Sequence, residues 1–209
     1  MTEPLRRSMV AIIAGRGITD ARVLAALEKI DRAAFVGAEQ GPFAYDDRPL
    51  PIGCGQTISQ PFIVAYMTER LGLSGVERVL EVGTGSGYQT SILAELAAEV
   101  RTVEVEPELA GAARPRLQRL GYENIRFKVG NGLEGWPDAA PFDRILVTAS
   151  LPGIPESLLG QLADGGSLVA PIGLSDGQHL IRVVRSGSRF ASETLMPVVF
   201  VLAHGTPNA

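Results

Sequence analysis

Three glycines at alternate positions separate an apolar stretch from a helical pattern. They are Gly83, Gly85 and Gly87 in the run EVGTGSG, with Thr84 and Ser86 between them. Glycine lets a backbone turn sharply and pass close to a ligand that a Cβ atom would obstruct. The helix expected after the turn adds unpaired N–H groups and the positive end of its dipole. The pattern therefore predicts that a small ligand binds at this turn.

Two carboxylates favour one class of nucleotide cofactor over another. The dinucleotide fingerprint G-x-G-x-x-G cradles a pyrophosphate, but Tyr88 stands where its third glycine belongs, and no lysine follows as in a phosphate-binding P-loop. Glu81, just before the turn, would repel the phosphates of NAD but attract the sulfonium and ammonium of S-adenosylmethionine. Glu104, at the end of the next expected strand, can accept hydrogen bonds from both ribose hydroxyls. The residues therefore favour a methyl donor.

Composition argues against several other kinds of site. The 209 residues are 45% apolar, enough for one substantial core, and the net charge of −4 gives no electrostatic reason to expect nucleic acid or an anionic membrane as partner. Cys54 is the only cysteine, and His179 and His204 are the only histidines. An internal disulfide is impossible, and we expect no metal site. No apolar stretch is long enough to span a membrane, so we expect a cytoplasmic protein.

The elements that position the turn alternate between strands and helices. We expect helices over 4–15, 20–30, 61–71, 87–97, 107–120 and 155–163, strands over 78–82, 100–104, 125–129, 142–148, 166–172, 178–185 and 190–202, and loop-rich segments over 31–59 and 130–141. Short β-branched strands separated by helices are typical of a doubly wound, mostly parallel α/β sheet with helices on both faces. Three residues join the last two strands, too few for a crossover, so these strands are predicted to form a C-terminal antiparallel hairpin.

Several runs outside the turn carry a family resemblance. The most specific is GQTISQP at 55–61, and further matches are LPIG at 50–53, MTE at 67–69, APFD at 140–143 and VTA at 147–149. With these runs the chain resembles the protein-L-isoaspartate O-methyltransferase family from about residue 9 to about residue 200. The resemblance implies a class I methyltransferase-like Rossmann fold.

The resemblance also implies a reaction. The methyl group of S-adenosylmethionine would pass to the α-carboxyl of an L-isoaspartyl residue in damaged proteins and peptides, leaving S-adenosylhomocysteine. The ester would collapse to a succinimide, which hydrolyses partly to normal aspartate. A carboxylate with a pKa of about 4 is already ionised at neutral pH, so no general base is required. The protein has to align a carboxylate oxygen with the methyl carbon, in line with the departing sulfur.

Roles for individual residues follow from the same resemblance. Ser59 would donate its hydroxyl to the substrate carboxylate, and it is also placed to cap the helix beginning at Pro61. The residues expected to shape the substrate site are Asp47, Leu50, Pro51, Ile52 and Thr57. The residues expected to bind the cofactor are Glu81, Gly83, Thr84, Gly85, Ser86, Gly87, Glu104, Asn131 and Gly132.

Two positions depart from the family pattern. The family has an aspartate between two glycines, which would accept from the adenine amino group, where this chain has Asn131. Asparagine keeps one carbonyl acceptor, so adenine recognition can survive. The C-terminal run FVLAHG at 200–205 also replaces the usual Phe-Val-Pro-Leu, in a segment that the family uses on the substrate side.

We expect two parts in the chain. Residues 1–59 would form N-terminal helices and a substrate-site loop packed on the main domain, and residues 60–209 would form the S-adenosylmethionine-binding domain. We expect a monomer that acts on isoaspartyl-containing proteins and peptides, with no nucleic acid or membrane as partner. Two alternatives stay open: a methyltransferase dedicated to aspartate of one partner peptide, and a cofactor-binding protein without catalysis.

Overall fold

The computed structural model describes residues 2–175 and 177–205. Within them the strands are β1 Leu50–Gly53, β2 Gln56–Ile58, β3 Arg78–Val82, β4 Glu99–Glu104, β5 Ile125–Val129, β6 Phe142–Val147, β7 Leu162–Leu174, β8 Gly177–Ser186 and β9 Arg189–Val198. The α-helices are α1 Glu3–Gly15, α2 Ala21–Lys29, α3 Pro61–Leu71, α4 Tyr88–Leu96, α5 Pro107–Arg119 and α6 Glu156–Gly160. Short 3-10 helices are η1 Arg32–Phe35, η2 Ala38–Phe43, η3 Gly132–Glu134 and η4 Pro137–Ala139.

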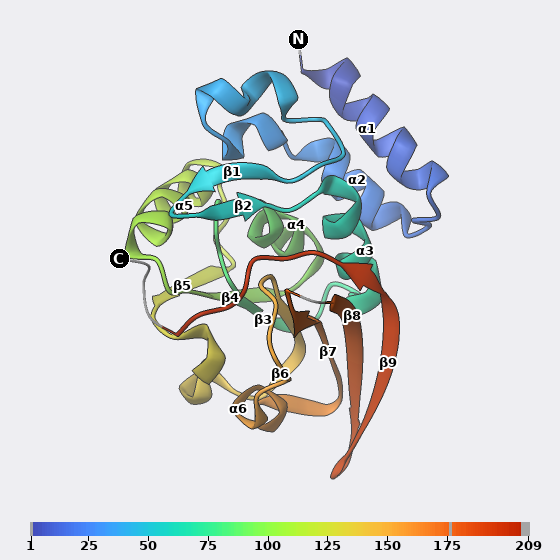
Figure 1. Ribbon diagram of the computed structural model, residues 1–209, viewed down its shortest axis with the longest axis vertical. Helices are drawn as coiled ribbons and strands as arrows, with labels where there is room; N and C mark the ends of the chain where they lie inside the picture. Colours follow the sequence, from blue (N-terminus) through green and yellow to red (C-terminus); the bar gives the residue numbers. More distant parts are fainter. Residues whose placement is uncertain (1, 176, 206–209) are drawn as a thin grey trace.

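A seven-stranded sheet in the order β5-β4-β3-β6-β7-β8-β9 forms the centre of the described chain (Figure 1). The strands from β5 to β7 are parallel, whereas β8 pairs antiparallel with both β7 and β9. The chain winds outward from β3 through β4 to β5 and then returns to β6 on the other side of β3. Ligands of such sheets bind beyond the carboxyl ends of the strands at this switch point. The predicted fold, with its C-terminal antiparallel hairpin, is confirmed.

Alternate side chains of the parallel strands enter two apolar clusters on opposite faces of the sheet. Val79 of β3 packs in one cluster with Ile92 of α4 and Leu117 of α5. Leu80 packs in the other cluster with Leu158 of α6. The first cluster extends without a break to α1, α2 and α3, so the N-terminal helices share the core of the sheet. Helices therefore cover both faces, with most of them on the α4 side.

One helix is much shorter than its pattern predicts. We expect a helix over 155–163, but α6 ends at Gly160 and β7 begins at Leu162. Leu162 pairs with Phe142 of β6, and the Gln161 side chain binds the backbone carbonyl of Glu134 at 2.8 Å and the N–H of Trp136 at 2.7 Å. These non-local bonds fix the segment in an extended path.

The loop-rich segment 31–59 contains no long regular element, as predicted, but it does contain the short antiparallel hairpin of β1 and β2. The last strand also ends earlier than expected, at Val198, and the following residues run as a tail along the sheet. This tail is held to the loop after β6, where Ser150 N–H donates to the Val201 carbonyl and Ala203 N–H donates to the Ser150 carbonyl, both at 2.8 Å. None of the helices in the described residues is both long enough and apolar enough to cross a membrane.

Candidate functional site

The glycine turn follows β3 directly, and its backbone explains its composition. Gly83, Gly85 and Gly87 have φ angles of 97°, 54° and 89°, in the region that side chains with a Cβ rarely adopt. A Cβ on Gly83 would lie 2.2 Å from the Thr148 hydroxyl oxygen, and one on Gly87 would lie 2.9 Å from a methyl group of Leu117. The turn is therefore closely packed between the loop after β6 and helix α5.

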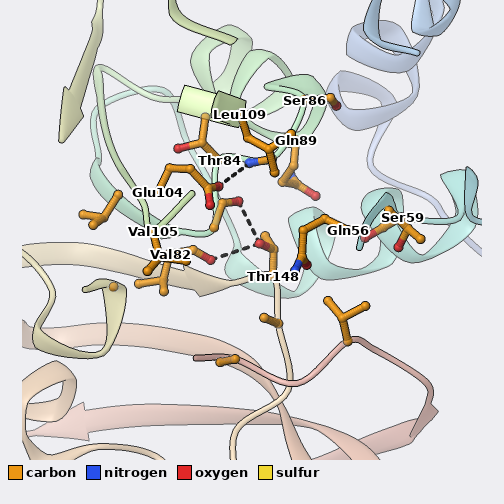
Figure 2. Close-up of a pocket in the computed structure, with 18 of the residues that line it drawn as sticks. Gln56, Ser59, Val82, Thr84, Ser86, Gln89, Glu104, Val105, Leu109 and Thr148 are labelled. Atoms are coloured by element: carbon orange, nitrogen blue, oxygen red, sulfur yellow. Dashed lines mark hydrogen bonds between the residues drawn. The ribbon is translucent and has the colours of Figure 1, made fainter. Parts of the chain in front are cut away.

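A cavity opens beside this turn, beyond the carboxyl ends of β3, β4 and β6 (Figure 2). We call it the donor cavity. The predicted cofactor residues that line it are Gly83, Thr84, Gly85, Ser86, Glu104 and Gly132. Further lining comes from residues 56–59 at the end of the β1–β2 hairpin and from tail residues 201–204. The tail was expected on the substrate side, and in the structure its residues 201–204 line the donor cavity.

Glu104 ends β4 with its carboxylate held in one orientation. Its Oε2 accepts from the N–H of Gly85 at 2.7 Å, and its Oε1 accepts from the N–H of Glu106 at 3.0 Å. A carboxylate offers about four lone-pair sites, so each oxygen retains acceptor capacity toward the cavity. This geometry fits a ligand that presents two neighbouring hydroxyls, such as a ribose.

Glu81 lies outside the residues that line the donor cavity, so its predicted contact with the cofactor stays a prediction. Successive residues of a strand point to opposite faces, and Val82 is the one that faces the cavity. The buried Glu81 Oε2 accepts from the hydroxyls of Thr90 at 2.6 Å and Thr102 at 2.7 Å. Burial raises the pKa of Glu81 to about 8 despite the two hydroxyl bonds, which by themselves lower it.

Asn131 and Gly87 also lie outside the lining of this cavity as the structure describes it. The Asn131 Oδ1 accepts from the N–H of Leu133 at 3.0 Å, and its Nδ2 donates to Glu134 at 3.1 Å. The side chain thus caps η3, as Asn and Asp do at helix starts. Its neighbour Gly132 does line the cavity, and a Cβ there would lie 2.5 Å from a methyl group of Val82.

A second cavity adjoins the first, and we call it the acceptor cavity. Its lining comes from Arg16, Pro49, Thr57, Ser59, Gln60, Phe62, Ile63 and Thr148, and from residues 196–201. Four residues line both cavities: Thr57, Ser59, Thr148 and Val201. We call these four the shared wall. A group that passes from a ligand in one cavity to a ligand in the other must pass along it.

Two predicted substrate residues, Thr57 and Ser59, belong to the shared wall, whereas Asp47, Leu50, Pro51 and Ile52 lie outside the described lining of both cavities. Leu50 is fully buried in the apolar cluster of α1 to α4. Pro51 and Ile52 lie in β1, where the Ile52 side chain packs toward the glycine turn, 3.3 Å from a Cβ built on Gly85. The loop that contains the predicted substrate residues therefore reaches the cavities through Thr57 and Ser59, and the roles predicted for its other side chains stay predictions.

Asp47 caps α3, the role that the sequence gives to Ser59. Its Oδ1 accepts from the N–H of Phe62 at 2.9 Å, and its Oδ2 accepts from Gln60 at 2.8 Å and pairs with Arg16. The residue before the helix, Gln60, makes no side-chain cap. The Ser59 side chain is therefore not needed for the helix start.

Thr148 has no role in the predictions from sequence, although the VTA run contains it. Its hydroxyl lies 2.8 Å from the Gly83 carbonyl and 3.0 Å from the Val82 carbonyl, so it donates to the backbone at the start of the turn (Figure 2). The pairing of β6 with β3 brings Thr148 next to the glycine turn, and local sequence patterns do not predict which strands pair. Among residues 2–175 and 177–205, no group of three or more His, Cys, Asp or Glu could hold a metal ion.

Comparison with known proteins agrees with this geometry. The sequence model of the protein-L-isoaspartate(D-aspartate) O-methyltransferase family matches residues 6–207. A protein-L-isoaspartate O-methyltransferase of Anaeromyxobacter dehalogenans is 53% identical over 203 residues, which cover 95% of this chain and 97% of the relative. A solved protein-L-isoaspartate O-methyltransferase superposes with a TM-score of 0.88 at 28% identity, over 97% of this chain and 67% of that one.

A second solved structure comes from Plasmodium falciparum and is described as a complex of a protein of this kind with S-adenosyl-L-homocysteine. It superposes with a TM-score of 0.83 at 25% identity, over 95% of this chain and 98% of that one. The family match, the identity over nearly the whole length and the two superpositions agree with one another. The chain therefore belongs to the protein-L-isoaspartate(D-aspartate) O-methyltransferase family.

Proposed function

We propose residue roles in this chain for the reaction of its family, in which S-adenosylmethionine methylates the α-carboxyl of L-isoaspartyl residues in proteins and peptides. The observation that carries the proposal is the shared wall of Thr57, Ser59, Thr148 and Val201 between two cavities. The methyl donor would occupy the donor cavity and the isoaspartyl peptide the acceptor cavity. The reacting atoms would then meet at the shared wall.

In the donor cavity, Glu104 would accept from the two ribose hydroxyls, because both carboxylate oxygens keep acceptor capacity there. The glycine turn, with Thr84, Gly85 and Ser86, would lie against the cofactor, and its glycines would let the backbone approach the cofactor closely. Gly132 would lie beside the adenine, and Asn131 would support it from the η3 cap. Glu81 would act as a positioning residue from beneath the turn.

In the acceptor cavity, the Ser59 hydroxyl would donate to the substrate carboxylate. A carboxylate is ionised at neutral pH, so the protein has to orient this nucleophile and exclude water and does not have to remove a proton. The half-buried Ser59 lies at the wall that the methyl group has to cross. A hydroxyl fixed at that place would hold one carboxylate oxygen and leave the other free to attack.

We also propose a division of labour along the chain. Residues 1–59 would supply Arg16, Pro49, Thr57 and Ser59 to the acceptor side, and residues 60–209 would supply the rest of that side and most of the donor side. The net charge of −4 supports protein and peptide substrates over nucleic acid or anionic membranes. We propose that the enzyme acts on them as a monomer in the cytoplasm.

One assay tests the substrate. Labelled S-adenosylmethionine is incubated with an isoaspartyl peptide and with its normal aspartyl twin, and base-labile methyl esters are counted. We expect turnover of the isoaspartyl peptide alone. Turnover of neither peptide would contradict the proposal. If S-adenosylhomocysteine still binds tightly in that case, the two alternatives remain: a methyltransferase dedicated to one partner peptide, or a cofactor-binding protein without catalysis. Turnover of both peptides would contradict selectivity for damaged residues.

A further inference from the structure

Arg32 is the one arginine or lysine that is fully buried among residues 2–175 and 177–205. Its guanidinium donates to three backbone carbonyls of the substrate loop: Nε to Ala44 at 2.8 Å, Nη1 to Ser59 at 2.9 Å and Nη2 to Arg48 at 3.3 Å. The three acceptors bracket the segment 44–59, which contains the β1–β2 hairpin. One side chain therefore joins the beginning of the substrate loop to its end.

The same guanidinium faces the donor side of the site. Its central carbon lies 5.1 Å from the ring centroid of Tyr88, the first residue of α4, and Tyr88 lines the donor cavity. Burial lowers the pKa of Arg32 to about 10, while Tyr88 and Asp47 act in the opposite direction. Arg32 is therefore a cation at neutral pH, and its contact with the ring is a cation–π contact.

We propose that Arg32 is a positioning residue for methyl transfer, which fixes the Ser59 carbonyl and thereby sets the Ser59 hydroxyl against the donor cavity. The inference rests on the role of Ser59 under the proposed function. Arg32 itself would touch neither substrate nor cofactor. It would act by holding the acceptor loop and α4 in one arrangement.

The shape of the guanidinium explains why an arginine is used. It presents five N–H donors in a rigid planar fork, whereas a lysine ammonium is a compact charge with three donors on a flexible stem. Three carbonyls that converge from an irregular loop need donors in fixed directions. A lysine at position 32 would keep the charge but would leave at least one buried carbonyl without its partner.

The chain offers a matched control in Arg144, near the amino end of β6. Its guanidinium also donates to three carbonyls, those of Leu71 at 2.6 Å, Asp143 at 2.8 Å and Gly72 at 3.1 Å. These acceptors lie at the end of α3 and the start of β6, and Arg144 lines neither cavity. Arg144→Lys therefore removes the same kind of bonding at a distance from the site.

The experiment compares Arg32→Lys with Arg144→Lys. We expect Arg32→Lys to lower kcat for an isoaspartyl peptide about 10- to 100-fold, because a displacement of about 1 Å is enough for such a loss. The Kd for S-adenosylhomocysteine, measured by calorimetry, should change by less than about twofold, because a lysine keeps the positive charge beside Tyr88 and leaves Glu104 and the glycine turn in place. Arg144→Lys lowers Tm without lowering kcat. Equal kcat losses in the two variants, or a Kd that rises as much as kcat falls, would overturn the inference.

A double-mutant cycle then separates Arg32 from Ser59. If Arg32 acts through Ser59, adding Arg32→Lys to Ser59→Ala causes no further loss of kcat. If the double variant loses the product of the two single-variant losses in kcat, the inference is overturned and the role of Ser59 stays intact. Full activity of Ser59→Ala would instead overturn the proposed role of Ser59 and the inference with it. Should the lysine variant fail to fold, Arg32→Gln, which keeps one donor group, takes its place under the same expectations.

Discussion

The carboxyl oxygen Oε2 of Glu81 lies 2.7 Å from the hydroxyl of Thr102, which joins β3 to β4 through a buried side-chain bond. The Thr102 hydroxyl also lies 2.6 Å from that of Thr84 in the glycine turn. A hydroxyl has only one hydrogen to donate. Thr102 donates its hydrogen to Glu81, so the hydrogen between Thr84 and Thr102 comes from Thr84. Glu81 is thus connected through two hydroxyls to Thr84, which lines the donor cavity, although Glu81 does not line it.

The buried Glu81 should make stability depend on pH. Its pKa is about 8 in the folded chain and 4.5 as an ordinary glutamate, so between these values the folded state binds more protons than the unfolded state. Stability then falls as pH rises through this window. Glu81→Gln does not titrate, so we expect its Tm relative to wild type, without cofactor, to increase from about pH 5 to about pH 8 and to level off above that. A Tm difference that is the same at every pH would contradict this.

Glu77 provides a control, because its pKa is shifted in the opposite direction from that of Glu81. Burial alone would raise its pKa, but hydrogen bonds from Ser74, Gly75 and Val76 outweigh burial and lower it to about 2. Its ionised form therefore stabilises the fold above pH 4.5, and this contribution disappears as pH falls toward 2. We expect Glu77→Gln to be less stable than wild type at neutral pH by roughly 2–3 kcal/mol, with the difference shrinking in acid.

Gly83→Ala should weaken cofactor binding. The new methyl group would meet the Thr148 hydroxyl at 2.2 Å on a backbone with φ 97°, which forces the turn away from β6. A residue with a Cβ at a positive φ typically costs about 1–3 kcal/mol of strain. Since about 1.4 kcal/mol corresponds to a factor of ten, we expect the calorimetric Kd for S-adenosylhomocysteine to rise about tenfold or more. Gly75→Ala is the matched control, because φ is 108° and no atom lies within 4 Å. Equal effects on Kd in both variants would point to general strain instead.

Ser59→Ala should separate catalysis from binding. Loss of one hydrogen bond to a charged group in the transition state, roughly 1.5–3 kcal/mol, lowers kcat by about 10- to 100-fold. The Kd for S-adenosylhomocysteine should not change, and Tm should change little because Asp47 caps α3 in place of Ser59. A lower Tm with unchanged kcat would show that the hydroxyl is structural.

Asn131→Asp should tighten cofactor binding modestly, by about two- to fivefold, since a charged acceptor makes the stronger hydrogen bond. One aspartate oxygen would keep the bond from the Leu133 N–H, and the second would replace an amide nitrogen that now donates to Glu134. Because two carboxylates repel each other, the exposed Glu134 side chain would have to move away, and that second oxygen would then be available to accept from the adenine amino group. Calorimetry with equal or weaker affinity for S-adenosylhomocysteine would contradict the prediction.

Local patterns in the sequence were sufficient for the regular elements around the turn. The predicted bounds of α3 and β3 agree with the structure, because Pro61 starts the helix and Gly72 ends it with a left-handed residue. The spacing of the three glycines is enough to predict the turn. Local chemistry determines these features within a few residues of chain.

Side-chain roles that depend on distant contacts could not be read in this way. Asp47 caps a helix that begins 14 residues later, and capping patterns look only at the residue next to the helix. Glu81 precedes the turn as a cofactor ligand would, but strand alternation turns it away. Arg32 looks like an exposed arginine until the loop 44–59 closes over it.

The shared wall has a consequence for how such an enzyme diversifies. Apart from its four residues, the described linings of the donor and acceptor cavities have no residue in common. Under the proposed roles, substitutions at acceptor positions such as Pro49 or Met196 would therefore alter which peptides are accepted without changing the affinity for the methyl donor. The two sides of the site can therefore change separately, whereas a bulkier side chain in the shared wall would intrude on both cavities at once.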